Sequence, residues 1–128
     1  MKIDKYKEYA PLIARVSISL VFLWFGLNEL INTEEWVTWL PQFAHNLPIA
    51  PTTLVLINGT FEIIFGGLLL LGLFTRITAF LLFIHLLGIS FSVGYSDVMI
   101  RDLGLSLVTL SIFLSGPDKW CLEKKLKW

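Results

Sequence analysis

Four long apolar runs dominate the sequence, and each is close to the ~20 residues that an α-helix needs to cross a ~30 Å hydrocarbon core. They cover about residues 11–31, 52–74, 77–95 and 98–115. Only 16% of the 128 residues are Asp, Glu, Lys or Arg, whereas soluble domains carry roughly 25%. So short a chain cannot bury this much Leu, Ile and Phe within itself. The sequence therefore predicts one all-α integral membrane domain, residues 1–128, with four transmembrane helices in a bundle that contacts the lipid bilayer.

The connections between the apolar runs differ in length. Residues 75–76 alone separate the second run from the third, and a few residues around Ser96 separate the third from the fourth. We expect these neighbours to form antiparallel hairpins. The first connection is longer, and it predicts a short outer interfacial helix that starts near Thr33. One side of this helix would carry the aromatic residues Trp36, Trp39 and Phe43.

Basic residues set the expected orientation in the membrane. Only Arg101 falls on the outer side of a four-span arrangement. By the positive-inside rule, both chain termini are expected in the cytoplasm. A cleaved signal peptide is the competing interpretation of the first run, but that run leads into Asn28-Glu29-Leu30 instead of a small-residue cleavage site. The inner side holds Lys2, Lys5, Lys7, Arg15, Arg76, Lys119, Lys124, Lys125 and Lys127.

Ionisable residues inside the spans are the strongest candidates for function. An unpaired charge at the bilayer centre costs at least ~2.5–3.5 kcal/mol, so such residues rarely face lipid. Glu62 lies near mid-depth of the second run, with Asn58 one turn before it and Gly66 one turn after it. His85 lies at a similar depth in the third run. Two interpretations stay open: a ligand pocket or proton-active site, and a hydrogen-bond cluster that only fixes helix packing.

A second polar group is expected near the outer ends of the spans. Glu29 ends the first run, and Arg101 with Asp102 lies near the start of the fourth. Because the planar guanidinium of Arg101 suits a carboxylate, we expect it to bind Glu29, Asp102 or Glu62. An ion-pair network that closes the outer end and a binding site at its mouth are both open interpretations. At the opposite end, Arg15 is expected to extend its side chain toward the inner surface.

Charge and cysteine content exclude several functions. Ten basic and ten acidic residues cancel, so there is no electrostatic case for binding nucleic acid. Cys121 is the single cysteine, which excludes an intramolecular disulfide and a Cys-x-x-Cys redox pair. The two histidines, His45 and His85, lack metal-ligand spacing, and haem ligation by His85 alone is a weak alternative. No phosphate-binding glycine loop or nucleophile elbow is present, so no catalytic residue is predicted.

Short motifs in a consistent order give the chain a resemblance to the DoxX family of small four-span membrane proteins. That resemblance implies a multi-pass plasma-membrane protein linked to quinone redox complexes, because some relatives resemble thiosulfate:quinone oxidoreductase subunits. Glu29 departs from the family, which often has Lys there, and this favours a Glu29–Arg101 pair. The motifs are Arg15-Val16-Ser17-Ile18, Phe25-Gly26-Leu27-Asn28-Glu29-Leu30, Gly59-Thr60-Phe61-Glu62, Leu71-Gly72-Leu73-Phe74-Thr75-Arg76, His85, Arg101-Asp102-Leu103-Gly104 and Gly116-Pro117.

The resemblance and the polar residues together favour an accessory subunit of a quinone-linked membrane redox complex, at most one subunit of a membrane oxidoreductase. Its ligand, with a quinone as the candidate, would contact Asn58, Glu62, His85, Glu29, Arg101 and Asp102. One alternative is a membrane assembly protein that binds a protein partner or a second copy of itself. The other alternative is a small proton-coupled carrier. Relatives on one scaffold do different jobs, so the fold does not decide among these hypotheses.

Overall fold

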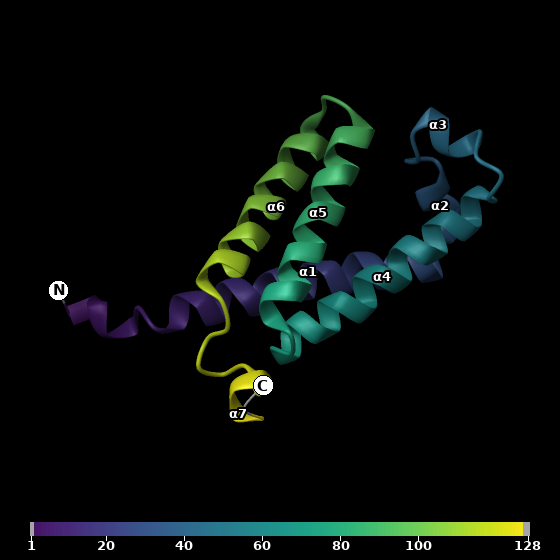
Figure 1. Cartoon of the computed structure of the whole chain (residues 1–128). Helices are drawn as coiled ribbons and strands as arrows, with labels where there is room; N and C mark the ends of the chain where they lie inside the picture. The colour runs from purple at the N-terminus through teal and green to yellow at the C-terminus, as the bar shows by residue number, and fades with distance from the viewer. Residues whose placement is uncertain (1, 127–128) are drawn as a thin grey trace.

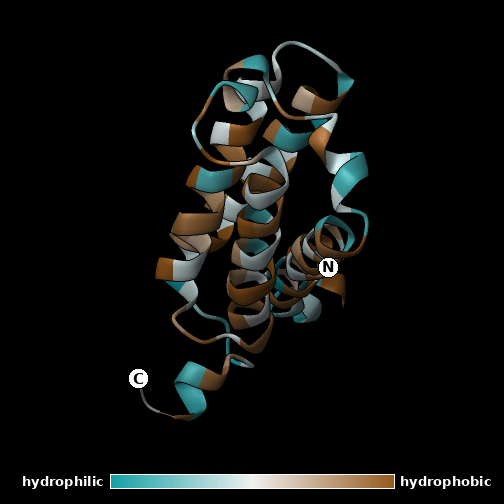
Figure 2. Ribbon diagram, turned by 90° about the vertical axis from the view of Figure 1, so that its right-hand side faces the viewer, coloured by the Kyte–Doolittle hydropathy of each residue, from teal (hydrophilic) through white to brown (hydrophobic). Residues whose placement is uncertain are grey.

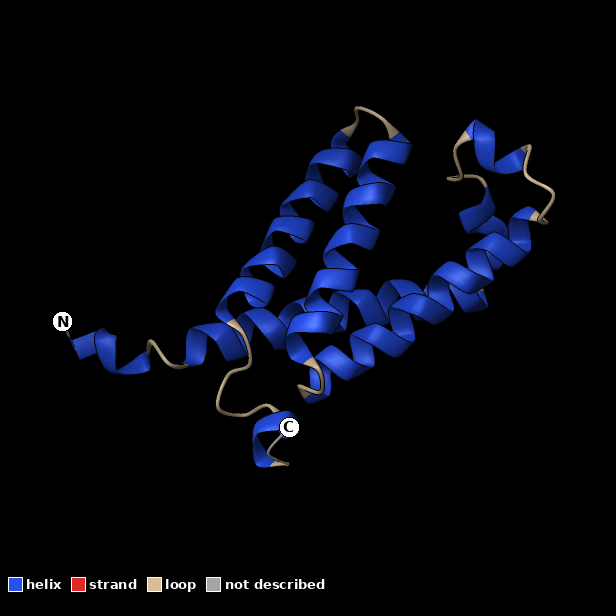
Figure 3. Cartoon of the chain, in the orientation of Figure 1, coloured by secondary structure: helices blue, strands red, loops and turns tan. Residues whose placement is uncertain are grey.

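The computed structural model describes residues 2–126, and every regular element in that part of the chain is a helix (Figure 3). Four helices are long and apolar enough to cross a membrane: α1 (Tyr9–Ile31), α4 (Pro51–Leu71), α5 (Thr75–Val93) and α6 (Asp97–Ser115). The predicted four-span all-α fold is therefore confirmed. Short helices η1 (Lys2–Tyr6) and α7 (Leu122–Lys125) flank the long ones. Lys127, counted above among the inner basic residues, lies outside the described residues.

Local backbone chemistry sets where the long helices begin and end. Pro51 occupies the first turn of α4, where its missing N–H leaves no hydrogen bond unmade. The same helix ends at Leu71, earlier than the expected residue 74, because Gly72 adopts a left-handed conformation with φ 76°. A Cβ atom on Gly72 would also lie 2.6 Å from the Cα of Cys121. At the start of α6, the Ser96 hydroxyl accepts a hydrogen bond from the Met99 N–H at 3.2 Å.

A short helix starts at Thr33 as predicted, but it does not continue to Phe43, because two short helices form instead of one. These are α2 (Thr33–Val37) and α3 (Gln42–His45), separated by a turn that ends at Pro41. Proline restricts the residue before it to extended backbone, so the chain cannot continue α2 through Leu40. Trp36, Trp39 and Phe43 consequently do not lie on one helix face.

The long helices form two hairpins that separate like the arms of a V (Figure 1). One hairpin pairs α1 with α4, and the other pairs α5 with α6. Although the α4–α5 turn is short, α4 and α5 diverge from it instead of packing along their length (Figure 1). We call the end that holds this turn and the C-terminal segment the closed end. The end that carries α2, α3 and the α5–α6 connection is the open end.

Two glycines allow α1 and α4 to cross closely. A Cβ atom on Gly26 would lie 2.8 Å from the carbonyl oxygen of Gly59, and one on Gly59 would lie 2.9 Å from that of Gly26. Further along α4, Gly66 faces the Cβ of Phe22 at 3.1 Å. Small residues allow such backbone approach between membrane helices. Gly26, Gly59 and Gly66 therefore all lie at the interface between α1 and α4.

The apolar core fills the closed end, where the two hairpins meet. Many large apolar side chains outside this core are exposed: Trp24 on α1 is 58% exposed and Leu114 on α6 is 67% exposed. Hydrophobic residues follow the long helices, and hydrophilic ones gather near their ends (Figure 2). This outward apolar surface suits contact with lipid and makes the protein a multi-pass membrane protein. The buried core residues are Ile18, Phe22, Leu69, Ala79, Leu82, Leu86 and Ile112.

Candidate ligand-binding cavity

A cavity of about 450 Å³ lies between the two hairpins toward the open end. Its volume falls in the ~300–1,000 Å³ range of small-molecule sites. Both hairpins contribute to its walls, and α2 and α3 with their connection close over it. Apolar side chains form most of the lining, including Val55 on α4 and Leu86 on α5. The cavity exists because α4 and α5 diverge, so its formation depends on the V-shaped arrangement.

Asn58 links two carboxyl groups at the polar part of this cavity. Its Nδ2 donates to both carboxyl oxygens of Glu29 at 2.9 Å and to Oε1 of Glu62 at 3.2 Å. Glu29 is 7% exposed and Glu62 is 4% exposed. All three residues line the cavity. Because Glu29 lies beside Gly59 at the close crossing of α1 and α4, glycine packing brings the two carboxyls together.

Glu62 also approaches His85 on the other hairpin. Nε2 of His85 lies 3.4 Å from Oε1 of Glu62, but the two atoms do not make a hydrogen bond. Nε2 of His85 and Oε2 of Glu62 are both buried without a hydrogen-bond partner among the described residues. The His85 ring packs on Phe61 with centroids 4.5 Å apart. Buried polar atoms without protein partners are uncommon, so these two atoms are available to bind a polar group.

Three carboxylates were expected as partners of Arg101, and the one that it contacts is its sequence neighbour Asp102. Its Nε lies 3.5 Å from Oδ1 of Asp102, and the arginine side chain is 54% exposed. The guanidinium lies over the ring of Phe25 at 5.5 Å. The Glu29–Arg101 pair favoured from the sequence does not form, because Asn58 engages Glu29 instead. Arg101 and Asp102 therefore form one wall of the cavity from α6.

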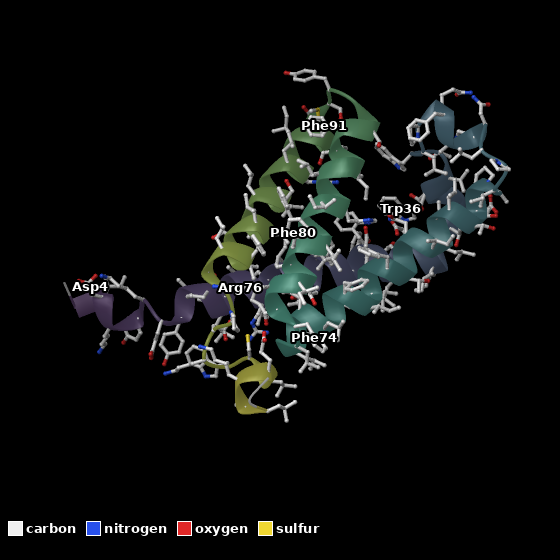
Figure 4. All side chains as sticks on the ribbon, viewed as in Figure 1. Asp4, Trp36, Phe74, Arg76, Phe80 and Phe91 are labelled. Atoms are coloured by element: carbon white, nitrogen blue, oxygen red, sulfur yellow. The ribbon has the colours of Figure 1, made fainter. Side chains whose placement is uncertain are left out.

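Aromatic side chains of the connection between α1 and α4 cover the cavity at the open end. Trp36, on α2, lies in the space between the two hairpins (Figure 4). Its ring meets that of Phe25 edge to face at 5.7 Å. Trp39 and Phe43 line the cavity too, although they are 54% and 60% exposed. The aromatic residues predicted for a membrane-surface helix thus also form part of an internal wall.

The closed end holds a second polar cluster, which the sequence analysis did not predict. Arg15 extends toward this end of the bundle, but it is only 3% exposed and so stays buried instead of reaching the surface. Its Nε donates to Oδ2 of Asp118 at 2.7 Å, and its Nη1 donates to the carbonyl oxygens of Leu69 and Leu70. Burial by itself would raise the pKa of Asp118, but hydrogen bonds from Arg15 and the Trp120 N–H outweigh it and hold that pKa below its ordinary value.

The C-terminal segment is attached to the α4–α5 turn beside that cluster. The Thr75 N–H donates to Oε1 of Glu123 at 2.8 Å, and the Glu123 N–H donates to the carbonyl of Gly72 at 3.1 Å. Cys121 is completely buried, and Thr75 Oγ1 donates to its sulfur at 3.5 Å. Asp118 is the signal in the sequence from which this attachment could have been predicted. A buried arginine needs a counter-charge at its own end of the bundle, and Asp118 lies in the C-terminal segment at the end where Arg15 lies.

The structure brings five of the six predicted site residues to one cavity: Glu29, Asn58, Glu62, Arg101 and Asp102. His85 is the exception: it lies 3.4 Å from Glu62 but does not line the cavity. Sequence reasoning missed the apolar wall formed by residues such as Val55, Leu86 and Leu54. No group of three His, Cys, Asp or Glu side chains within residues 2–126 is arranged to hold a metal ion.

The fold and the cavity define a small four-span membrane protein with an acidic, aromatic-lined cavity between two helical hairpins. The chain matches the DoxX family over residues 10–94 and belongs to that family. It is also 28% identical over 130 residues to an uncharacterized membrane protein of Mycobacterium tuberculosis (strain ATCC 25618 / H37Rv), covering 88% of this chain and 78% of that relative. No solved structure matches this chain. The resemblance stated from the motifs is therefore confirmed at the level of the family.

Proposed function

We propose that this protein is an accessory subunit of a quinone-linked membrane redox complex and that its cavity binds the quinone. The observation that carries the proposal is the carboxyl of Glu62, buried and with Oε2 unpartnered, at the polar part of a mostly apolar cavity. A quinone has a flat polar head and a long apolar tail, which matches a cavity that has both polar and aromatic walls. In its acid form, Glu62 donates a hydrogen bond to a quinone carbonyl.

The other predicted residues have distinct roles in this proposal. Asn58 holds the carboxyls of Glu29 and Glu62 in place through three hydrogen bonds. His85, 3.4 Å from Glu62, exchanges a proton with it and so couples the cavity to the second hairpin. Arg101 and Asp102 border the outer part of the cavity and control access to it.

Quinone binding tests the proposal directly. Decylubiquinone added to the protein in lipid nanodiscs should quench tryptophan fluorescence, because Trp36 and Trp39 line the cavity. Replacing Glu62 by Leu removes the polar contact and should weaken binding at least about tenfold, which equals ~1.4 kcal/mol. Glu34→Leu is the matched control, because Glu34 is exposed on α2 and does not line the cavity. Equal binding by both variants and the unsubstituted protein would contradict the quinone role.

A proton-transfer role for Glu62 needs a separate test in native membranes. Glu62→Gln preserves side-chain size but removes the titratable carboxyl proton, so quinone-dependent respiration should fall while assembly stays normal. A variant that assembles normally and keeps full quinone-coupled activity would refute this role.

The assembly alternative has its own supporting observation. Trp39 and Phe43 expose more than half of their surface at the open end, which suits contact with a membrane partner. Under this alternative, replacing both residues by Ala abolishes recovery of the partner, whereas Glu62→Gln changes only stability. For the carrier alternative, liposomes containing the protein would have to show substrate flux that depends on a proton gradient.

We also propose that the protein lies in the plasma membrane with both termini in the cytoplasm. The basic residues of the described chain gather at the closed end, where Arg76 and Lys119 lie, and Arg101 lies at the other end. Reporter fusions to each terminus test this orientation. An active periplasmic reporter at either terminus would reverse it.

A further inference from the structure

The polar part of the cavity contains more acidic than basic groups. Glu29, Glu62 and Asp102 all line it. Asp102 has Arg101 as its ion-pair partner at 3.5 Å. Within residues 2–126, no lysine or arginine forms an ion pair with Glu29 or Glu62. The imidazole of His85 is the basic group beside them, and it approaches Glu62 alone.

Hydrogen bonding at these carboxyls is also incomplete. Asn58 uses one amide nitrogen for contacts with both Glu29 and Glu62, so its two hydrogens are already shared. Oε2 of Glu62 is buried and unpartnered, and Glu62 as a whole is 4% exposed. When Glu62 is ionised, this oxygen lacks a hydrogen-bond donor and the carboxylate lacks a lysine or arginine counter-charge among the described residues. Buried carboxylates are stable in proteins when a ligand or side chain supplies both.

The aromatic walls add a second attraction for positive charge. The ring of Trp36 lines the cavity, and Trp and Phe ring faces attract ammonium and guanidinium groups. Phe25, which also lines the cavity, already makes a cation–π contact, because the Arg101 guanidinium lies over its ring at 5.5 Å. The same cavity thus combines carboxyl groups with rings that favour cations.

We propose that the cavity binds a lipophilic amine whose protonated head contacts Glu62 and Glu29 and whose apolar body lies against Val55, Leu86 and Trp36. An ammonium head supplies up to three hydrogen-bond donors, one of which can reach the unpartnered Oε2 of Glu62, and one positive charge to balance the carboxylates. A neutral quinone supplies neither. This inference rests only on the ligand-binding part of the proposed function and does not require the ligand to be a quinone.

The test uses three probes that share one apolar body: phenylbutylamine, phenylbutanol and phenylbutyrate. Binding is measured by titration calorimetry with the protein in lipid nanodiscs, and empty nanodiscs correct for partition into lipid. The amine should bind at least about tenfold more tightly than the alcohol, and the carboxylate more weakly than either. Glu62→Gln should weaken amine binding about tenfold and change alcohol binding less than about twofold. The matched control, Glu34→Gln on exposed α2, should leave all three affinities unchanged.

Equal affinity for the amine and the alcohol would overturn the inference, as would an amine affinity unaffected by Glu62→Gln. Should that variant fail to assemble, the ranking of the three probes on the unsubstituted protein decides, and Glu29→Gln, at the other carboxyl that contacts the ammonium head, replaces it. Decylubiquinone binding is measured on the same samples. Quinone binding without amine preference overturns this inference alone, amine preference without quinone binding overturns the quinone role alone, and no binding of either overturns both.

Discussion

Nε of Arg15 donates a hydrogen bond of 2.7 Å to Oδ2 of Asp118, and each side chain is only 4% exposed. This pair joins the first span to the segment that follows the last one. Because Arg15 also donates to the carbonyl oxygens of Leu69 and Leu70, it ties in the C-terminal end of α4 as well. Arg15 therefore links α1, α4 and the C-terminal segment at the closed end, from which the hairpins diverge.

Removing Asp118 should destabilise the protein strongly. Asp118→Ala leaves the guanidinium of Arg15 buried without a counter-charge, which typically costs about 3–5 kcal/mol. Denaturant unfolding of the detergent-solubilised protein, followed by circular dichroism, measures the change. The control is Glu8→Gln, which breaks the exposed Lys119–Glu8 pair of 3.0 Å and should cost at most about 1 kcal/mol. Similar losses in the free energy of unfolding for the two variants would show that the buried pair stabilises the protein no more than the exposed pair does.

The same pair predicts how stability depends on pH. The pKa of Asp118 is held below its ordinary value by Arg15 and the Trp120 N–H, although burial opposes this. A lowered folded-state pKa contributes stability that is complete above the unfolded-state value of ~3.9 and is lost as the pH falls through the folded-state value. Thermal midpoints should therefore drop in acid below about pH 4. In Asp118→Asn this contribution should vanish, and an acid-induced drop identical to that of the unsubstituted protein would contradict it.

The α1–α4 crossing should tolerate no added methyl group at Gly59. A Cβ atom there lies 2.9 Å from the Gly26 carbonyl oxygen and 3.0 Å from the Glu29 Cβ, so the helices must separate. Gly59→Ala should cost about 1–3 kcal/mol in unfolding experiments. Gly67→Ala, on the same helix with no atom within 4 Å of the added Cβ, should be neutral or up to about 1 kcal/mol stabilising. Equal effects at the two positions would argue against a close crossing.

Cys121 reports whether the C-terminal segment stays attached. Its side chain is completely buried, so maleimide should label it slowly in the folded protein. Glu123→Ala removes the 2.8 Å hydrogen bond from the Thr75 N–H and should accelerate labelling about tenfold or more, since such a bond contributes ~1.5–3 kcal/mol. Lys124→Ala, at an exposed position of the same short helix, serves as the control. Rapid labelling of the unsubstituted protein would show that the segment detaches readily.

Part of the candidate site was predictable from single residues. Glu62 stood out because a carboxyl at mid-depth of a span is costly unless it faces the bundle, and Asn58 shared its helix face. Which carboxyl would engage Arg101 was not predictable, because Glu29, Asp102 and Glu62 were all candidates. The Gly26–Gly59 crossing decided this by placing Glu29 beside Asn58.

The positions of the four spans, the all-helical fold and the family were determined by the sequence itself. Hydrophobic length, small-residue stripes and end signals such as Pro51 act along one helix, so they need no knowledge of its neighbours. The cavity, the Arg15–Asp118 pair and the attachment of Glu123 to Thr75 were decided by the tertiary structure. They depend on the angle between two hairpins and on contacts between distant segments. Those follow from how helix surfaces pack together in three dimensions, not from the periodicity of any single helix.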